Sequence, residues 1–126
     1  MWIMLSDSFV SIVVTPDTPR DHLLVRARSK GDIEKLFGAV KVTKTPKSDY
    51  LFRAFINKKL VTSTIASEIG RINYDNFKNT VVDDDRHDAY LRCWVAMHDF
   101  QKERATKKRK KRFVKKEFTD PVQPAW

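Results

Sequence analysis

"YLFRAFI", residues 50–56, is the stretch that decides the fold. Six of its seven residues are apolar, which is typical of a strand with neighbours on both sides. The turn residues "PKSD" come before it, and Asn57 directly after it is a preferred first residue of a helix. The sequence therefore predicts a central strand that leads straight into a helix.

Three other runs supply partners for this central strand. The β-rich segments 9–14 and 22–28 flank the loop "TPDTPRD", whose prolines and aspartates predict a hairpin. The segment "VKVTKT" (40–45) alternates between apolar and polar residues and forms a second hairpin with 50–56. The chain therefore contains at least four predicted strands.

Three helices are predicted between and after the strands. "SKGDIEKLFG" (29–38) pairs Ser29 with Asp32 at capping-box spacing and places Gly38 at the helix end. The segment that follows Asn57 has an apolar stripe with polar flanks. "DDDRHDAYLRCWVAMHDFQKER" (83–104) predicts a longer, C-terminal helix with an acidic first turn.

The order of these elements predicts an α+β fold in a permuted ferredoxin-like arrangement, ββαββα, followed by the long C-terminal helix. A right-handed crossover gives a four-stranded antiparallel sheet in the order 9–14, 22–28, 50–56, 40–45, with two helices on one face. Residues 2–5 are a candidate for a short edge strand. We expect one domain over residues 1–104 and a basic extension over 105–126.

Strand alternation assigns side chains to the two faces of the sheet. The helix-facing set is Val10, Ile12, Val14, Leu23, Val25, Ala27, Val40, Val42, Tyr50, Phe52, Ala54 and Ile56. The opposite set is Phe9, Leu24, Arg26, Arg28, Lys41, Leu51, Arg53 and Phe55. Two interpretations of the second face stay open: a stacking platform for single-stranded nucleic acid, or a face covered by Tyr90, Leu91 and Trp94, with the arginines paired to Asp83, Asp84, Asp85 and Asp88.

Positive charge is concentrated at the C-terminal end of the chain. Residues 1–100 hold 15 Lys and Arg against 13 Asp and Glu, whereas residues 101–126 hold 10 against 3. No apolar run reaches the roughly 18 residues that a membrane helix needs, and the start of the chain lacks the basic segment of a signal peptide. With a single cysteine, Cys93, the composition favours a cytoplasmic protein.

The run "KKRKKR" (107–112) is the main candidate for binding an anionic partner, above all DNA or RNA. Adjacent cations repel one another, so the helix is expected to fray here unless phosphates neutralise it. The alternative is a solvated tail. The candidate nucleic-acid-binding residues are Lys107, Lys108, Arg109, Lys110, Lys111, Arg112, Lys115 and Lys116, together with Arg26, Arg28 and Arg53 on the sheet.

The stretch "DDDRHD" (83–88) is the place where a histidine and several carboxylates crowd together. His87 with Asp83, Asp84 and Asp88 is a candidate for a divalent-metal site that cuts phosphodiesters. Carboxylates at a helix start are also what the helix dipole favours, and no second cluster supplies further ligands. No Gly-rich phosphate loop occurs in the sequence. We therefore expect a protein that is not an enzyme and has no cofactor.

Several stretches, "MWIMLSDSFVSIV", "LLVRARSKGDIEKLF", "DYLFRAFI", "INYDNFKNTV" and "DDRHDAYLRCWVAM", resemble a family of small uncharacterised bacterial proteins, some from phage or mobile elements. The resemblance spans about residues 1–100 and implies no activity. It implies a bacterial or phage setting, and the basic tail lies outside it.

These observations favour a small non-enzymatic protein that associates with nucleic acid through its basic run. The alternative is a phage or mobile-element accessory protein that binds and obstructs a host protein or nucleoprotein complex through its sheet edge or tail. The first predicts binding to naked DNA or RNA, and the second predicts capture of one specific host protein. The sequence gives no base preference and no oligomeric state.

Overall fold

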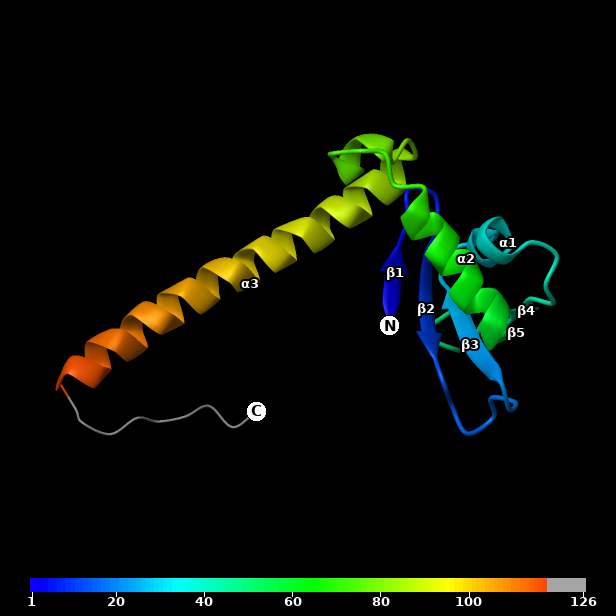
Figure 1. Ribbon diagram of the computed structural model, residues 1–126, viewed down its shortest axis with the longest axis horizontal. Helices are drawn as coiled ribbons and strands as arrows, with labels where there is room; N and C mark the ends of the chain where they lie inside the picture. Colours follow the sequence, from blue (N-terminus) through cyan, green and yellow to red (C-terminus); the bar gives the residue numbers. More distant parts are fainter. Residues whose placement is uncertain (118–126) are drawn as a thin grey trace. The chain divides into compact units, whose positions relative to one another are not determined.

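The computed structural model describes the backbone of residues 1–117 and the side chains of residues 1–108. The chain divides into two compact units, Met1–Arg86 and His87–Trp126. The first contains a sheet and two α-helices, and the second contains most of one long helix (Figure 1). The predicted α+β class and the long C-terminal helix are confirmed.

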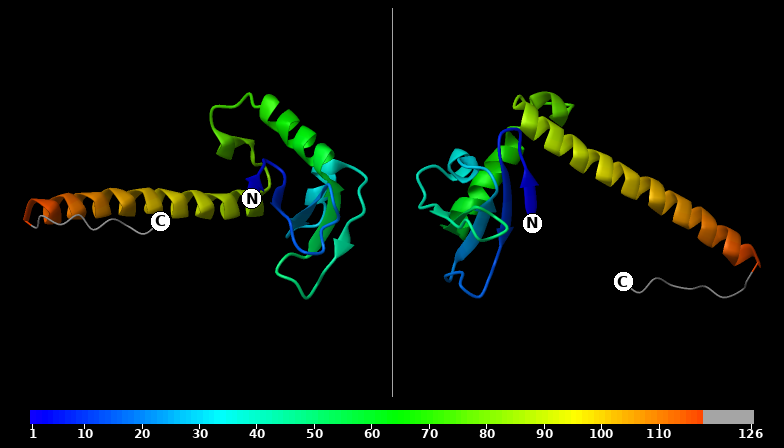
Figure 2. Two further views of the ribbon diagram at one scale, coloured as in Figure 1. Left: turned by 60° about the horizontal axis from the view of Figure 1, so that its bottom comes forward. Right: turned by 180° about the vertical axis from the view of Figure 1, so that it is seen from behind.

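An antiparallel sheet is the framework of the first unit (Figures 1 and 2). It has five strands in the order β1-β2-β3-β5-β4. Their bounds are β1 (Trp2–Met4), β2 (Phe9–Val13), β3 (His22–Ala27), β4 (Thr43–Lys44) and β5 (Phe52–Asn57). The order from β2 to β4 is the predicted one. The prediction of four strands is wrong by one, because residues 2–4 pair with β2 and extend the sheet.

The strand β4 is shorter than the predicted segment 40–45. Only Thr43 and Lys44 pair with β5. The residues before them leave the ladder, since the Val40 N–H donates to the Gly38 carbonyl at 2.8 Å. Val40 and Val42 still pack against the core as partly buried side chains. The alternation therefore predicted their burial correctly, although not their strand pairing.

The core lies between the sheet and two helices, α1 (Asp32–Phe37) and α2 (Lys58–Gly70), which cover one face of the sheet (Figure 2). The buried core residues are Val10, Val25, Ala27, Ala54 and Ile56 from the strands, Ile33 and Phe37 from α1, and Val61 from α2. Two of the predicted helix-facing residues belong elsewhere. Val14 follows the end of β2 and is exposed, and Tyr50 comes before β5 begins and lies with the arginines of the other face.

The helix ends follow the predicted chemistry in part. Asn57 caps α2, because its Oδ1 accepts from the Lys59 N–H at 2.9 Å. Gly38 ends α1 with a positive φ of 74°, as expected of a glycine at that position. The predicted capping box of Ser29 and Asp32 is wrong: α1 follows Gly31 at φ 90° and has no side-chain cap.

Asp32 has a different partner, which explains why it does not cap the helix. Its carboxylate is 1% exposed and accepts two hydrogen bonds from Arg86, Oδ1 at 2.7 Å and Oδ2 at 3.1 Å. Oδ2 also accepts from the Phe9 N–H at 3.0 Å. A buried carboxylate is tolerated because both of its oxygens are bonded. This pair ties the end of the first unit to β2 and α1.

The second unit is dominated by α3 (Asp84–Glu117), which begins in the last residues of the first unit. The Oδ1 of Asp83 accepts from the Asp85 N–H at 3.1 Å and caps the helix. Its backbone is helical through the basic run, although repulsion between cations predicted fraying there. Lys and Arg have good intrinsic helix propensities, which favour this continuation. The predicted boundary at 104/105 falls inside this helix, and residues 118–126 lie outside the described residues.

Candidate nucleic-acid interface

Arg26 and Arg53 stand directly opposite each other on neighbouring strands, β3 and β5. Each guanidinium has a partner on the same unit. An Arg26 Nη donates to the Ser11 Oγ at 3.0 Å, and an Arg53 Nη lies 3.5 Å from an Asp49 carboxylate oxygen. Two like charges at opposed positions repel each other. Their position therefore needs compensation from the residues around them.

Tyr50 supplies part of that compensation. Its side chain is 3% exposed, and the guanidinium carbons of Arg26 and Arg28 lie 4.4 and 4.2 Å from its ring centre. A cation over an aromatic face is attracted to the ring's negative quadrupole. Residues 48–51 are bends, so the alternation of β5 does not extend back to Tyr50. This is why the sequence assigned Tyr50 to the wrong face.

We call Arg26, Arg28, Arg53, Asp49 and Tyr50 the arginine–tyrosine cluster. Arg28 also donates to the Asp49 carbonyl at 2.9 Å. The cluster has three positive charges and one carboxylate, and Asp49 is itself exposed, which weakens its pairing with Arg53. The buried Nε atoms of Arg26 and Arg53 have no hydrogen-bond partner among the described residues. With three guanidinium groups against one carboxylate, the cluster carries excess positive charge.

The partners of these arginines test part of one alternative, in which α3 covers this face of the sheet and its acidic residues pair with the arginines. The sequence predicted pairing with the acidic residues Asp83, Asp84, Asp85 and Asp88. The contacts described for Arg26, Arg28 and Arg53 are with Ser11, Asp49 and Tyr50 instead. Pairing with Asp83, Asp84 and Asp85, which belong to the same unit, is therefore wrong, because a neighbouring loop supplies both the ring and the carboxylate, and pairing with Asp88 of the second unit stays a prediction. Covering of this face by Tyr90, Leu91 and Trp94 stays a prediction.

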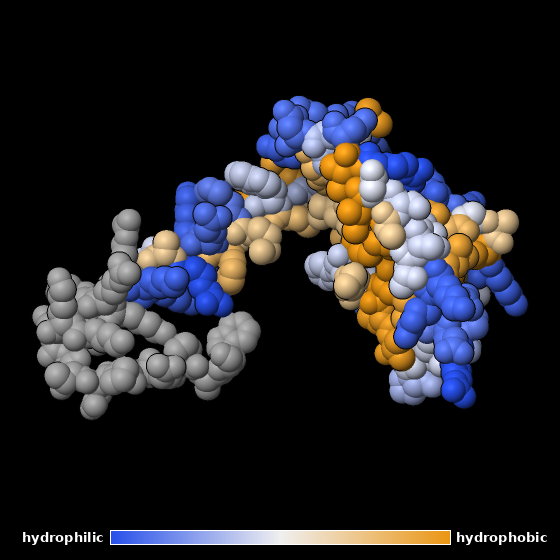
Figure 3. Space-filling view, viewed as in Figure 1, coloured by the Kyte–Doolittle hydropathy of each residue, from blue (hydrophilic) through white to orange (hydrophobic). Residues whose placement is uncertain are grey.

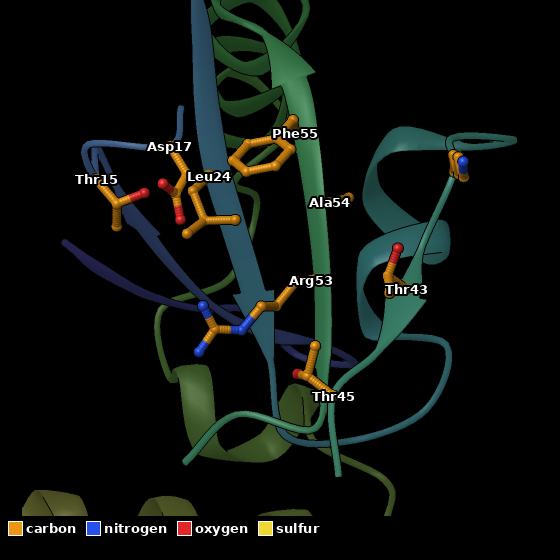
Figure 4. A pocket seen from close by; sticks show the side chains of 9 residues that line it. Thr15, Asp17, Leu24, Thr43, Thr45, Arg53, Ala54 and Phe55 are labelled. Atoms are coloured by element: carbon orange, nitrogen blue, oxygen red, sulfur yellow. The ribbon is translucent and has the colours of Figure 1, made fainter. Parts of the chain in front are cut away.

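An exposed phenylalanine lies on the same face as the arginines. Phe55 is 47% exposed, and it projects from the same side of β5 as Arg53 (Figure 4). Together with Leu24, Thr15 and Asp17 they line an open pocket. Its other lining residues are Lys41, Thr43, Thr45 and Ala54. Proteins that bind single-stranded nucleic acid combine aromatic rings, on which bases stack, with cations that attract the phosphates.

Phe9 was the second predicted stacking residue, and it is less available than Phe55. It is partly buried and makes an edge-on contact with Trp2, with ring centres 5.7 Å apart. Trp2, which the sequence analysis did not select, is 68% exposed on the edge strand β1. The signal that could have found it is its place in residues 2–5, an apolar run that was a candidate for a short edge strand.

The basic run belongs to α3. Lys107 and Lys108 are exposed. Arg109, Lys110, Lys111, Arg112, Lys115 and Lys116 are within the helical range Asp84–Glu117, and their side chains lie outside the described residues. Ten helical residues, 107–116, span about 15 Å, so eight cations are gathered over a short length of rod.

The central part of α3 carries exposed apolar side chains. Leu91, Trp94, Met97 and Phe100 are all exposed, and Figure 3 shows apolar residues along the lower side of the helix. The Trp94 ring stacks on His98 with centres 4.9 Å apart. The Arg104 guanidinium lies 5.1 Å from the centre of the Phe100 ring.

The acidic stretch 83–88 is arranged as a helix start. Asp83 caps the helix, Asp84 and Asp85 occupy its first turn, and Arg86 is bound to Asp32. Among the described residues, no three His, Cys, Asp or Glu side chains are grouped as ligands of a metal ion. The carboxylates of this stretch are therefore explained by the cap at Asp83 and by the favourable interaction of negative charge with the start of a helix.

No protein family model matches the chain significantly, and no curated protein or solved structure does so either. Within the described residues, every helix is too short or too polar to cross a lipid bilayer.

Proposed function

We propose that this protein is a non-enzymatic nucleic-acid-binding protein that grips phosphates with the basic run of α3. The observation that carries the proposal is the continuity of α3 through Glu117, which gives the run a rod-like frame. Cations displayed along a helix follow a phosphate backbone and release its counterions. Affinity of this kind depends on charge and is poor in sequence preference.

The arginine–tyrosine cluster supports the same proposal as a second contact surface. Its excess positive charge attracts phosphates, and the exposed Phe55 offers a ring on which an unpaired base stacks. We further propose that the sheet and its two helices form a permuted ferredoxin-like arrangement that β1 extends by one strand. DNA and RNA are both candidate partners.

A second candidate function rests on the edge strand β1. It is three residues long and carries the exposed Trp2, and an open sheet edge pairs readily with an extended peptide. This favours the alternative, a bacterial phage or mobile-element accessory protein that obstructs a host protein or nucleoprotein complex.

A pull-down with the full chain from a bacterial lysate, with and without nuclease, separates the two functions. Nucleic-acid binding predicts that fluorescent oligonucleotides bind directly and that captured proteins disappear after nuclease treatment. The alternative predicts one protein that is retained after nuclease and fails to bind when Trp2 is changed to Lys. Oligonucleotides that do not bind would overturn the first proposal.

A further inference from the structure

A single row of side chains crosses all five strands on the face of the sheet that carries the arginines. Directly paired residues of neighbouring antiparallel strands project from the same face, so the strand register defines the row. Its members, from β1 to β4, are Trp2, Ser11, Arg26, Arg53 and Thr43. The row therefore begins with an aromatic ring on the edge strand and has two guanidinium groups at its centre.

A neighbouring row on this face carries a second aromatic ring. Val13 pairs with Leu24, and Leu24 pairs with Phe55. This row lies two residues along the strands from the first, so its side chains project from the same face. Phe55 and Arg53 project side by side from β5 (Figure 4). The two rings, Trp2 and Phe55, therefore lie on one face with the opposed arginines beside the path between them.

The spacing of the two rings suits a strand of nucleotides that crosses the sheet. Neighbouring strands are about 4.8 Å apart and two residues span about 6.7 Å along a strand, so the backbones of Trp2 and Phe55 are about 16 Å apart. Both residues belong to the first unit, so the sheet alone fixes this distance. Stacked bases of one strand are about 3.4 Å apart, so the two rings cannot hold consecutive stacked bases. The nucleotides between the two bases pass Arg26 and Arg53.

We infer that this face binds single-stranded nucleic acid, with one unpaired base on Trp2, a second on Phe55, and the phosphates between them near Arg26 and Arg53. The inference rests on the proposed function and names the class of its ligand. A base inside a duplex has both faces covered by its neighbours, and it reaches a protein ring only after it is flipped out of the stack. An unpaired base stacks without that cost.

The charge of this face is complementary to the same ligand. The arginine–tyrosine cluster has three guanidinium groups against one carboxylate, and the pocket beside Phe55 adds Lys41 against Asp17. The face is therefore positive and attracts phosphates. A contact made by charge alone favours the duplex, because two strands place more phosphates along each length of axis than one strand does. A preference for the single strand is therefore the signature of the rings.

Binding of a fluorescent single strand and of a duplex of the same sequence and length, at one salt concentration, measures this preference. The full chain is expected to bind the single strand more tightly. Trp2→Leu with Phe55→Leu removes both rings but keeps apolar side chains and the charge. We expect it to weaken single-strand binding by roughly fivefold or more for each ring, and duplex binding little.

Two further variants are matched controls for the rings. Trp2→Phe with Phe55→Tyr keeps a ring at both positions and is expected to keep the preference. Tyr74→Leu removes an aromatic ring from the loop after α2, outside the sheet, and is expected to bind like wild type. Melting temperatures establish that each variant is folded. If the double Leu variant does not fold, Trp2→Leu alone, on the edge strand, makes the same comparison.

The outcomes separate this inference from the proposed function. If no oligonucleotide binds, both are overturned. Equal affinity for the single strand and the duplex, or Leu variants that bind like wild type, would overturn the inference alone, and a sheet face covered by another part of the chain would give that result. With residues 107–112 changed to Gln, we expect weaker binding with the single-strand preference retained. A preference lost with the basic run would show that the run selects the strand, and would also overturn the inference.

Discussion

Asp32 and Arg86, 54 positions apart in the sequence, are joined by two hydrogen bonds of 2.7 and 3.1 Å between nearly buried side chains. Removing one member of such a pair leaves the other charge buried without compensation. We expect Asp32→Ala or Arg86→Ala to lower the free energy of unfolding by about 3–5 kcal/mol.

Urea unfolding of the two single variants and of the double variant measures this effect. The double variant should lose much less than the sum of the single losses, because no charge is left alone. The control is Lys35→Ala: this ammonium is half exposed, 3.8 Å from Asp32, and contributes about 1 kcal/mol at most. Additive losses would show that Asp32 and Arg86 act independently.

Tyr50 is the buried centre of the arginine–tyrosine cluster. Tyr50→Leu keeps an apolar side chain there but removes the ring that faces Arg26 and Arg28. We expect a loss of about 1–3 kcal/mol, whereas Tyr50→Phe, which keeps the ring, loses less. Thermal unfolding of both variants makes the comparison, and equal losses would mean that the ring face contributes nothing.

Trp94 tests whether α3 covers the sheet face that carries Arg26 and Arg53. If its side chain is buried against the sheet of the same chain, Trp94→Ala is expected to lower the free energy of unfolding by about 3–5 kcal/mol. Thermal unfolding of the variant beside wild type measures the loss, and an unchanged melting temperature would contradict covering of the face by this side chain.

His87 and Asp88 test whether the acidic stretch has a catalytic role. We expect no cleavage of single- or double-stranded oligonucleotides by the wild type in Mg²⁺ or Mn²⁺, and unchanged oligonucleotide binding by His87→Ala with Asp88→Asn. Metal-dependent cleavage by the wild type that is lost in the double variant would establish a nuclease.

The strand order was predictable because alternation over β2, β3 and β5 is strong. Only one crossover connection was needed, and such connections are right-handed. The pairing of Asp32 with Arg86 could not be predicted, since no local pattern links residues so far apart. Ser29 and Asp32 matched a capping box in spacing alone, and α1 has no side-chain cap. Tyr50 was misplaced because the bends at 48–51 interrupt the alternation. Two of the candidate site residues, Arg26 and Arg28, lie over the ring of Tyr50, and Arg53 pairs with the neighbouring Asp49, relationships visible only after folding.

The basic run can be removed without removing the core. Truncation after Thr106 takes the formal charge from +9 to +3, because eight of the 25 cations leave with Glu117 and Asp120. Among the described residues, the buried apolar side chains lie between Val10 and Tyr90, so the melting temperature should change little. A second variant, with residues 107–112 all changed to Gln, keeps the chain length and the helix propensity as a matched control for the charge.

A salt titration of oligonucleotide binding by the full chain, the truncated chain and the Gln variant tests the central claim most directly. About five to eight phosphate contacts predict that log affinity falls with log salt at a slope of roughly −4 to −7 for the full chain. Both variants should bind far more weakly and with a shallower slope, at an unchanged melting temperature. Equal affinity of the three proteins, or a flat salt dependence of the full chain, would contradict the proposal that the basic run of α3 grips nucleic acid.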